Sequence, residues 1–145
     1  MSTPASTSTS DLADALAARL QREPDVLVAY LFGSWARGEG GAVSDVDVAV
    51  LLGASPTLAR YAALTAAVGE VTGSERADVV VLDDAPIPLA YRVLRDGRLL
   101  FSRDEGARVR HWVRTVDRYL DMAPLRAVLQ EGTRRRLKEG RFGRP

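Results

Sequence analysis

The chain has 145 residues, of which 46% are hydrophobic and 27% charged, and its formal net charge at pH 7 is +1. This length suits a single globular domain with its own core, and no apolar run is long enough to span a membrane. The sequence contains no cysteine and one histidine, His111. Disulfides, thiol catalysis and zinc sites made of cysteines or several histidines are therefore excluded.

The two ends of the chain differ from its middle. Residues 1–10 are rich in serine and threonine and lack the basic and apolar regions of a secretory signal, so we expect a disordered leader and a cytoplasmic protein. Residues 1–102 carry 8 basic and 13 acidic side chains, whereas residues 103–145 carry 12 basic and 6 acidic ones. We interpret the basic part as a solvated helix face and tail rather than a site for direct nucleic-acid binding.

Hydrophobic periodicity, turn residues and capping residues divide the chain into helices and strands. The expected elements are a helix at 11–22, strands at 26–32 and 46–52, a helix from 56 or 57 to 72, a strand at 75–82, a helix at 89–95, a short edge strand at 98–101, a helix ending near 121, and a last helical piece at 125–138 after a break at Pro124. This order predicts an α/β (α+β) fold with a mixed sheet of three to four strands flanked by helices. The single domain should cover residues 11–138, followed by a basic tail at 139–145.

The loop between the first two strands carries groups that suit a phosphate. Gly33 follows the first strand and lets backbone N–H groups approach an anion, Ser34 adds a hydroxyl donor, and Arg37 adds a bidentate cation. Because this loop is short, the two strands should run antiparallel. Gly-Ser by itself is a weak signal, and its value depends on what opens the next strand.

Two aspartates, Asp45 and Asp47, stand at the start of the second strand. Side chains alternate between faces along a strand, so these carboxylates point the same way and raise each other's pKa. A divalent cation relieves that repulsion, and Mg²⁺ prefers carboxylate and phosphate oxygens. Asp-x-Asp also occurs by chance in turns before strands. Its combination with the Gly-Ser loop favours a site for metal ions and a nucleotide.

These residues resemble the signature of the DNA polymerase β-like nucleotidyltransferase superfamily, which has Gly-Ser, an arginine, and Asp-x-Asp on the next strand. The Gly-Ser-x-Ala-Arg-Gly form at residues 33–38 is similar to its minimal nucleotidyltransferase (MNT) branch. The resemblance implies a third catalytic carboxylate on a following strand. Asp78 is the candidate, because it is the polar exception near the start of an apolar strand, although turn chemistry or an ion pair with Arg76 would also explain it.

The resemblance implies a Mg²⁺-dependent transferase with two metal ions held by Asp45, Asp47 and Asp78, and with ATP as substrate. Gly33, Ser34 and Arg37 would bind the phosphates. MNT proteins of this size are similar to the antitoxins of MNT–HEPN pairs, which transfer AMP to a tyrosine of a HEPN RNase toxin, so a HEPN-type partner in a hetero-oligomer is expected. The alternatives are an aminoglycoside-type nucleotidyltransferase with a small acceptor, and a non-catalytic antitoxin that neutralises its partner by binding.

Overall fold

The structure is a computed structural model that describes residues 8–36, 38, 45–73 and 77–138, with side chains described as far as residue 122. Its elements are α1 (Thr9–Leu20), β1 (Val28–Phe32), β2 (Val46–Leu51), α2 (Leu58–Thr72), β3 (Ala77–Val81), α3 (Ile87–Asp96), β4 (Arg98–Ser102) and α4 (Glu105–Lys138). The expected mixed sheet flanked by helices is confirmed. The leader and the basic tail fall mainly on residues outside the described ranges.

The four strands form one sheet in the order β3-β2-β1-β4. β1 pairs antiparallel with both β2 and β4, whereas β3 runs parallel to β2. The antiparallel pairing of the first two strands is therefore confirmed, and the helix α2 makes the crossover that the parallel β2–β3 pair requires. The sheet has β3 and β4 at its edges, and its central strands β1 and β2 are almost entirely buried.

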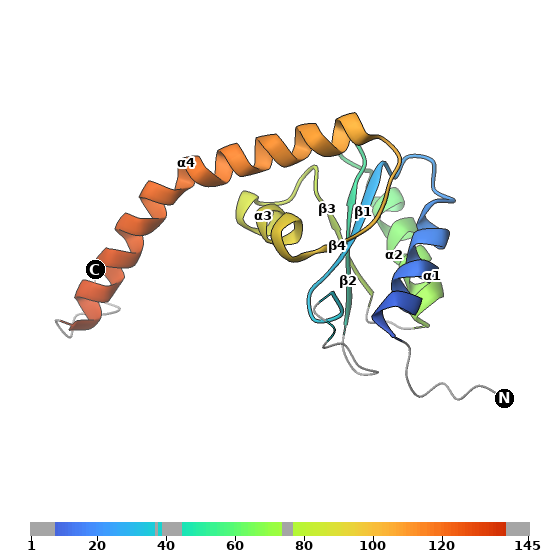
Figure 1. The fold of residues 1–145 in the computed structure, drawn as a ribbon, viewed down its shortest axis with the longest axis horizontal. Coiled ribbons are helices and arrows are strands. Elements are labelled where there is room, and N and C mark those ends of the chain that lie inside the picture. The colour runs from blue at the N-terminus through green and yellow to red at the C-terminus, as the bar shows by residue number, and fades with distance from the viewer. Residues whose placement is uncertain (1–7, 37, 39–44, 74–76, 139–145) are drawn as a thin grey trace.

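Helices cover both faces of the sheet (Figure 1). On one face, α1 and α2 contribute Leu12, Leu16, Leu20, Leu64 and Val68 to a core that includes Leu31, Val48 and Val50. On the other face, Ala90 and Val93 of α3 pack against Val28, Tyr30, Ala49 and Leu51. Burial on both faces explains why β1 and β2 read as continuous apolar runs rather than alternating ones. None of the described helices is both long enough and apolar enough to cross a membrane.

The helix boundaries follow from local capping. α1 begins at Thr9, two residues before the expected start, because the Ser8 side chain caps it by accepting a hydrogen bond from the Asp11 N–H at 3.0 Å. α2 has the expected boundaries: the Thr57 side chain caps its first turn, and Gly73 ends it with a left-handed φ of 64°.

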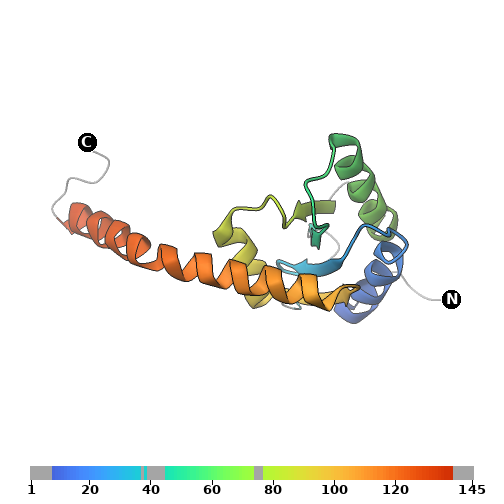
Figure 2. The same ribbon diagram turned by 90° about the horizontal axis from the view of Figure 1, so that it is seen from above.

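The prediction of a break at Pro124 was wrong, because α4 continues as one helix from Glu105 to Lys138. A proline inside a helix removes one backbone hydrogen bond, and the helix can bend there instead of ending. Figures 1 and 2 show α4 running across one end of the sheet and then extending away from the body, with a change of direction in its outer part.

The inner face of α4 carries two buried polar residues. His111 is only 4% exposed, and Thr115, one turn later, is 2% exposed. The Thr115 hydroxyl lies 3.4 Å from the His111 Nε2. Burial, and then the charge of Arg114, lower the pKa of His111, against an opposing effect of Asp83.

Candidate active site

The site begins at the sharp turn that follows β1. Gly33 has φ of 76°, a conformation that residues with a Cβ rarely adopt, and residues 33–36 form a hydrogen-bonded turn rather than a helix. A Cβ added at Gly33 would lie 2.3 Å from Oδ2 of Asp47. Glycine is therefore needed at this position for two reasons. It adopts the positive φ of the turn, and it leaves room for the Asp47 carboxylate directly beside the turn.

Trp35 anchors the turn to the protein core. Its side chain is 8% exposed and packs in the core shared with α1 and α2. Its backbone carbonyl accepts hydrogen bonds from the Thr9 hydroxyl at 3.1 Å and from the Gly38 N–H at 3.2 Å. Ser34 is half-buried within the same turn. Arg37, expected to contact phosphate, lies outside the described residues.

Asp47 and Asp78 lie side by side on neighbouring strands. In the register of the sheet, Asp47 of β2 pairs with Asp78 of parallel β3 on one side and with Phe32 of β1 on the other. Strand alternation places Asp47 on the same face as Ala49 and Leu51, which is the face covered by α3. Asp45 lies just before β2 and is exposed. The structure thus brings the second and third predicted carboxylates together beside the glycine turn, with the first close by.

The electrostatics of this cluster are those of crowded like charges. Partial burial, and then the negative charges of Asp78 and Asp45, raise the pKa of the Asp47 carboxyl above its ordinary value. The folded chain therefore holds Asp47 in a place where its charge is disfavoured, which is common at functional sites.

Asp47 and Asp78 both line a cavity of about 280 Å³ between the end of the sheet and α3. Its other lining residues are Phe32, Gly33, Val80, Leu89, Arg92 and Asp96. Asp45 and Ser34 are not among them. The cavity is therefore lined by both acidic and apolar side chains. Arg92 is the one basic side chain among the described residues that line it.

Arg92 and Asp96 were missed by the sequence analysis, although a signal existed. Leu89, Arg92 and Asp96 are spaced i, i+3 and i+7, so they share one face of α3. The missing information was which end of the sheet that face would meet. Asp96 also accepts hydrogen bonds from the neighbouring Arg95 at 2.8 and 2.9 Å.

The donor set suits Mg²⁺ that arrives together with phosphate oxygens. Among the described residues, no group of three or more His, Cys, Asp or Glu side chains is arranged to hold a metal ion as it stands. Mg²⁺ does not need such a cage, because it usually takes one or two carboxylates and completes its octahedron with water and phosphate. Asp47 and Asp78 supply hard oxygen ligands on adjacent strands, and a cation between them would relieve the repulsion that raises the pKa of Asp47.

Comparison with known proteins agrees with this geometry. The sequence profile of the family described as polymerase beta, nucleotidyltransferase matches residues 14–106, which include the glycine turn and all three aspartates. No curated protein sequence matches the chain closely enough to count as a relative.

Solved structures with the same fold come from toxin–antitoxin complexes. One, a toxin–antitoxin with AMP-PNP, has a TM-score of 0.70 and 24% identity over 82% of this chain and 96% of that chain. Another contains a tri-AMPylated Shewanella oneidensis HEPN toxin with its MNT antitoxin, with a TM-score of 0.66 and 22% identity over 85% of this chain and 97% of that one. A third, the toxin–antitoxin MntA–HepT, has a TM-score of 0.64 and 22% identity over 83% and 95% of the respective chains.

Proposed function

Because the chain belongs to the polymerase β nucleotidyltransferase family, we propose that it transfers AMP from ATP to a tyrosine hydroxyl of a HEPN-type toxin and thereby acts as the antitoxin. The observation that carries this proposal is the placement of Asp47 and Asp78 side by side in one cavity with Gly33. Carboxylates and a close-approach turn are what a magnesium nucleotide requires.

In the proposed reaction, the tyrosine oxygen attacks the α-phosphorus of ATP in line with the departing pyrophosphate. One P–O bond forms, the bond to pyrophosphate breaks, and the hydroxyl proton leaves the acceptor. The charge of the triphosphate must be neutralised and the attacking oxygen positioned, because phosphoryl-type transfer depends mainly on placement and electrostatics.

Phosphate binding and metal binding are assigned to different residues according to their positions. The turn at Gly33 and Ser34 holds the terminal phosphates through backbone N–H groups and the hydroxyl, with Arg37 beside it in the sequence. Asp45, Asp47 and Asp78 would hold Mg²⁺, which would neutralise phosphate charge and favour the ionised acceptor. Asp78 lies at the exposed edge of the sheet, where an incoming hydroxyl can reach it.

Arg92 extends the site beyond the residues expected from the sequence. Arg92 lines the same cavity as Asp47 and Asp78, and it belongs to α3 rather than to the turn. A guanidinium binds phosphate oxygens bidentately. We assign it to the nucleotide, so Arg92→Ala should raise the KM for ATP without changing complex formation with the toxin.

The partner assignment is supported by the solved complexes, in which chains of this fold are found with HEPN toxins and with an ATP analogue. Those chains are matched over at least 95% of their length, so this chain contains the counterpart of nearly the whole of each. A hetero-oligomer with a HEPN protein is the arrangement that follows.

The test is transfer of mass to the partner. The purified chain, Mg²⁺, ATP and the HEPN protein encoded beside it should give a mass gain of about 329 Da per modified tyrosine, the mass of AMP less water. Asp45→Asn/Asp47→Asn should abolish the gain while leaving the fold intact. Asp14→Asn, which changes an exposed aspartate of α1, is the matched control and should transfer normally.

Three outcomes would count against the proposal. If the double variant still neutralised the toxin, the chain would act as a binding module without chemistry. If the wild-type chain modified an aminoglycoside but not the HEPN protein, the acceptor would be a small molecule. If transfer proceeded equally well with EDTA in place of Mg²⁺, the carboxylates would have another role.

A further inference from the structure

Over the part of α4 that crosses the body of the protein, the most deeply buried side chains are polar. These are His111 and Thr115, beside Ala107, which packs against the core, and Tyr119, which stacks on Tyr91 of α3. Val109, Val113 and Leu120 face outward and are 47%, 46% and 60% exposed. A surface helix normally turns its apolar side chains to the core and its polar ones to water. This arrangement leaves the more apolar face of the helix without a partner in the described structure.

The outward residues form a continuous surface. Positions 109, 113, 116 and 120 are spaced i, i+4, i+7 and i+11, so the exposed Val109, Val113 and Leu120 follow one line along the helix together with Val116, which is half-buried. We call this line the outer apolar stripe. Trp112, at 47% exposure, lies beside it. Single exposed apolar residues are ordinary, but a row over three turns of one helix is typical of a surface that another molecule covers.

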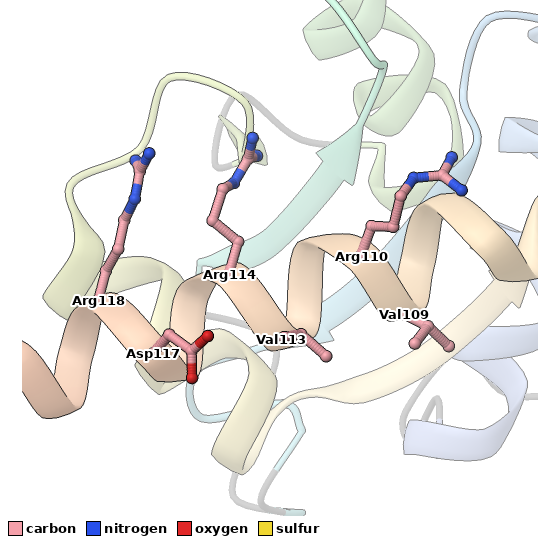
Figure 3. Close-up of a pocket in the computed structure, with 6 residues that line it drawn as sticks. All are labelled: Val109, Arg110, Val113, Arg114, Asp117 and Arg118. Atoms are coloured by element: carbon pink, nitrogen blue, oxygen red, sulfur yellow. The ribbon is translucent and has the colours of Figure 1, made fainter.

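A row of arginines runs parallel to the stripe. Arg110, Arg114 and Arg118 are spaced i, i+4 and i+8, and Figure 3 shows their guanidinium groups on one side of α4, with Val109 and Val113 on the other. The three arginines, the two valines and Asp117 line an open groove of about 490 Å³. Like charges one turn apart destabilise a helix slightly, and an acidic partner would remove that repulsion.

From the stripe and the arginine row we propose that the outer face of α4 docks a helix of the partner toxin, one that presents an apolar ridge flanked by acidic residues. The proposal rests on the proposed function for the identity of the partner. The stripe lies after residue 106, where the match to the catalytic family ends. The catalytic part and the docking part are therefore adjacent but separate along the chain.

Other occupants fit the charges less well. In a twofold antiparallel pair of this helix, the arginine row of each copy would lie beside the row of the other, which is repulsive. Residues 1–7 of this chain contain no acidic side chain, and residues 139–145 contain two arginines and one glutamate. Neither end supplies the acidic partner that the arginine row requires.

The experiment measures binding and transfer separately, with the HEPN protein encoded by the adjacent gene as the probe. Val113→Glu/Leu120→Glu places two charges on the stripe and replaces one poor helix former with a good one, so the helix is retained. Arg110→Glu/Arg118→Glu reverses the charge of two of the three arginines in the row and leaves Arg114, whose charge helps to lower the pKa of His111. Leu58→Glu, at a leucine of α2 that is 84% exposed, is the matched control.

We expect the stripe variant to weaken the Kd for the HEPN protein by about tenfold to 100-fold, as for hot-spot residues at interfaces. The arginine variant should weaken it similarly at low salt and lose most of the salt dependence shown by the wild type. Binding of AMP-PNP with Mg²⁺ should be unchanged in both variants. Leu58→Glu should match the wild type in every measurement.

Failure of this proposal and failure of the proposed function give different results. If the wild type transfers AMP and the stripe variant binds and transfers equally well, the docking surface is refuted and the function stands. If the wild type binds through the stripe but transfers nothing, the function is refuted and the docking surface stands. A wild-type homodimer that the stripe variant dissociates, or no wild-type complex at all, overturns the docking proposal.

Discussion

Replacing Gly33 by alanine tests the geometry on which the site depends. Gly33 has φ of 76°, and a residue with a Cβ in this left-handed region costs about 1–2 kcal/mol. For a chain of this length, that loss corresponds to a fall in Tm of roughly 2–8 °C. The added Cβ would also stand 2.3 Å from Oδ2 of Asp47, where ordinary contact begins near 3.4 Å. The carboxylate would therefore have to move by about 1 Å.

A displacement of this size matters more for chemistry than for folding. The Asp47 carboxylate can turn away at little cost in stability, but a misplacement of about 1 Å in a reacting constellation lowers rates by roughly 100-fold. Gly73→Ala is the matched control, because Gly73 has a similar φ of 64° and nothing within 4 Å of an added Cβ. Both variants should lose similar stability, and only Gly33→Ala should lose transfer.

The assay follows AMP transfer by intact-protein mass spectrometry at a temperature where both variants are fully folded, with thermal unfolding measured in parallel. The reasoning is refuted if Gly33→Ala transfers AMP as fast as Gly73→Ala. It is also refuted if Gly33→Ala recovers full activity once its lower stability is compensated, since the loss would then be one of folding.

Three further predictions concern charge and stability. Folding raises the pKa of Asp47, so its ionisation disfavours the folded state, and Asp47→Asn should raise Tm at pH 7 with a gain that vanishes below the ordinary carboxyl range; an unchanged or lower Tm at pH 7 would contradict this. Asp83→Asn should instead lower stability by about 1–3 kcal/mol in urea unfolding, because Asp83 accepts the N–H groups of Leu52 and Gly53 at 2.8 and 2.7 Å. Folding lowers the pKa of His111, so wild-type stability should decline as the pH falls below 6.5, and His111→Gln should flatten that decline in unfolding curves between pH 7 and 5.

The sequence predicted the central part of the fold because the signals there are local. β1 and β2 are runs of β-branched and aromatic residues with a glycine turn between them, and their antiparallel pairing follows from the short loop. α2 carries its own start and stop in Thr57 and Gly73. The prediction at Pro124 was wrong because a proline is also a local signal, whereas α4 continues through it as one helix.

The site was predictable in composition but less so in arrangement. The alternation rule placed Asp47 on one face of β2, and the parallel register with β3 then brought Asp78 beside it. The register depends on how α2 crosses over, which no spacing within the sequence fixes. Arg92 could not be found in this way, because it reaches the cavity only through the packing of α3 on the sheet.

α4 shows most clearly where sequence periodicity stops being informative. The pattern distinguishes the apolar face of a helix from the polar one, and the usual rule sends the apolar face to the chain's own core. In α4 the rule holds only in part, since His111 and Thr115 are the most deeply buried side chains whereas Val109 and Val113 are exposed. The rule that apolar helix faces are buried would still hold if the exposed valines packed against a partner protein. Under the proposed function, an apolar helix face that is left exposed identifies the interface before the partner is known.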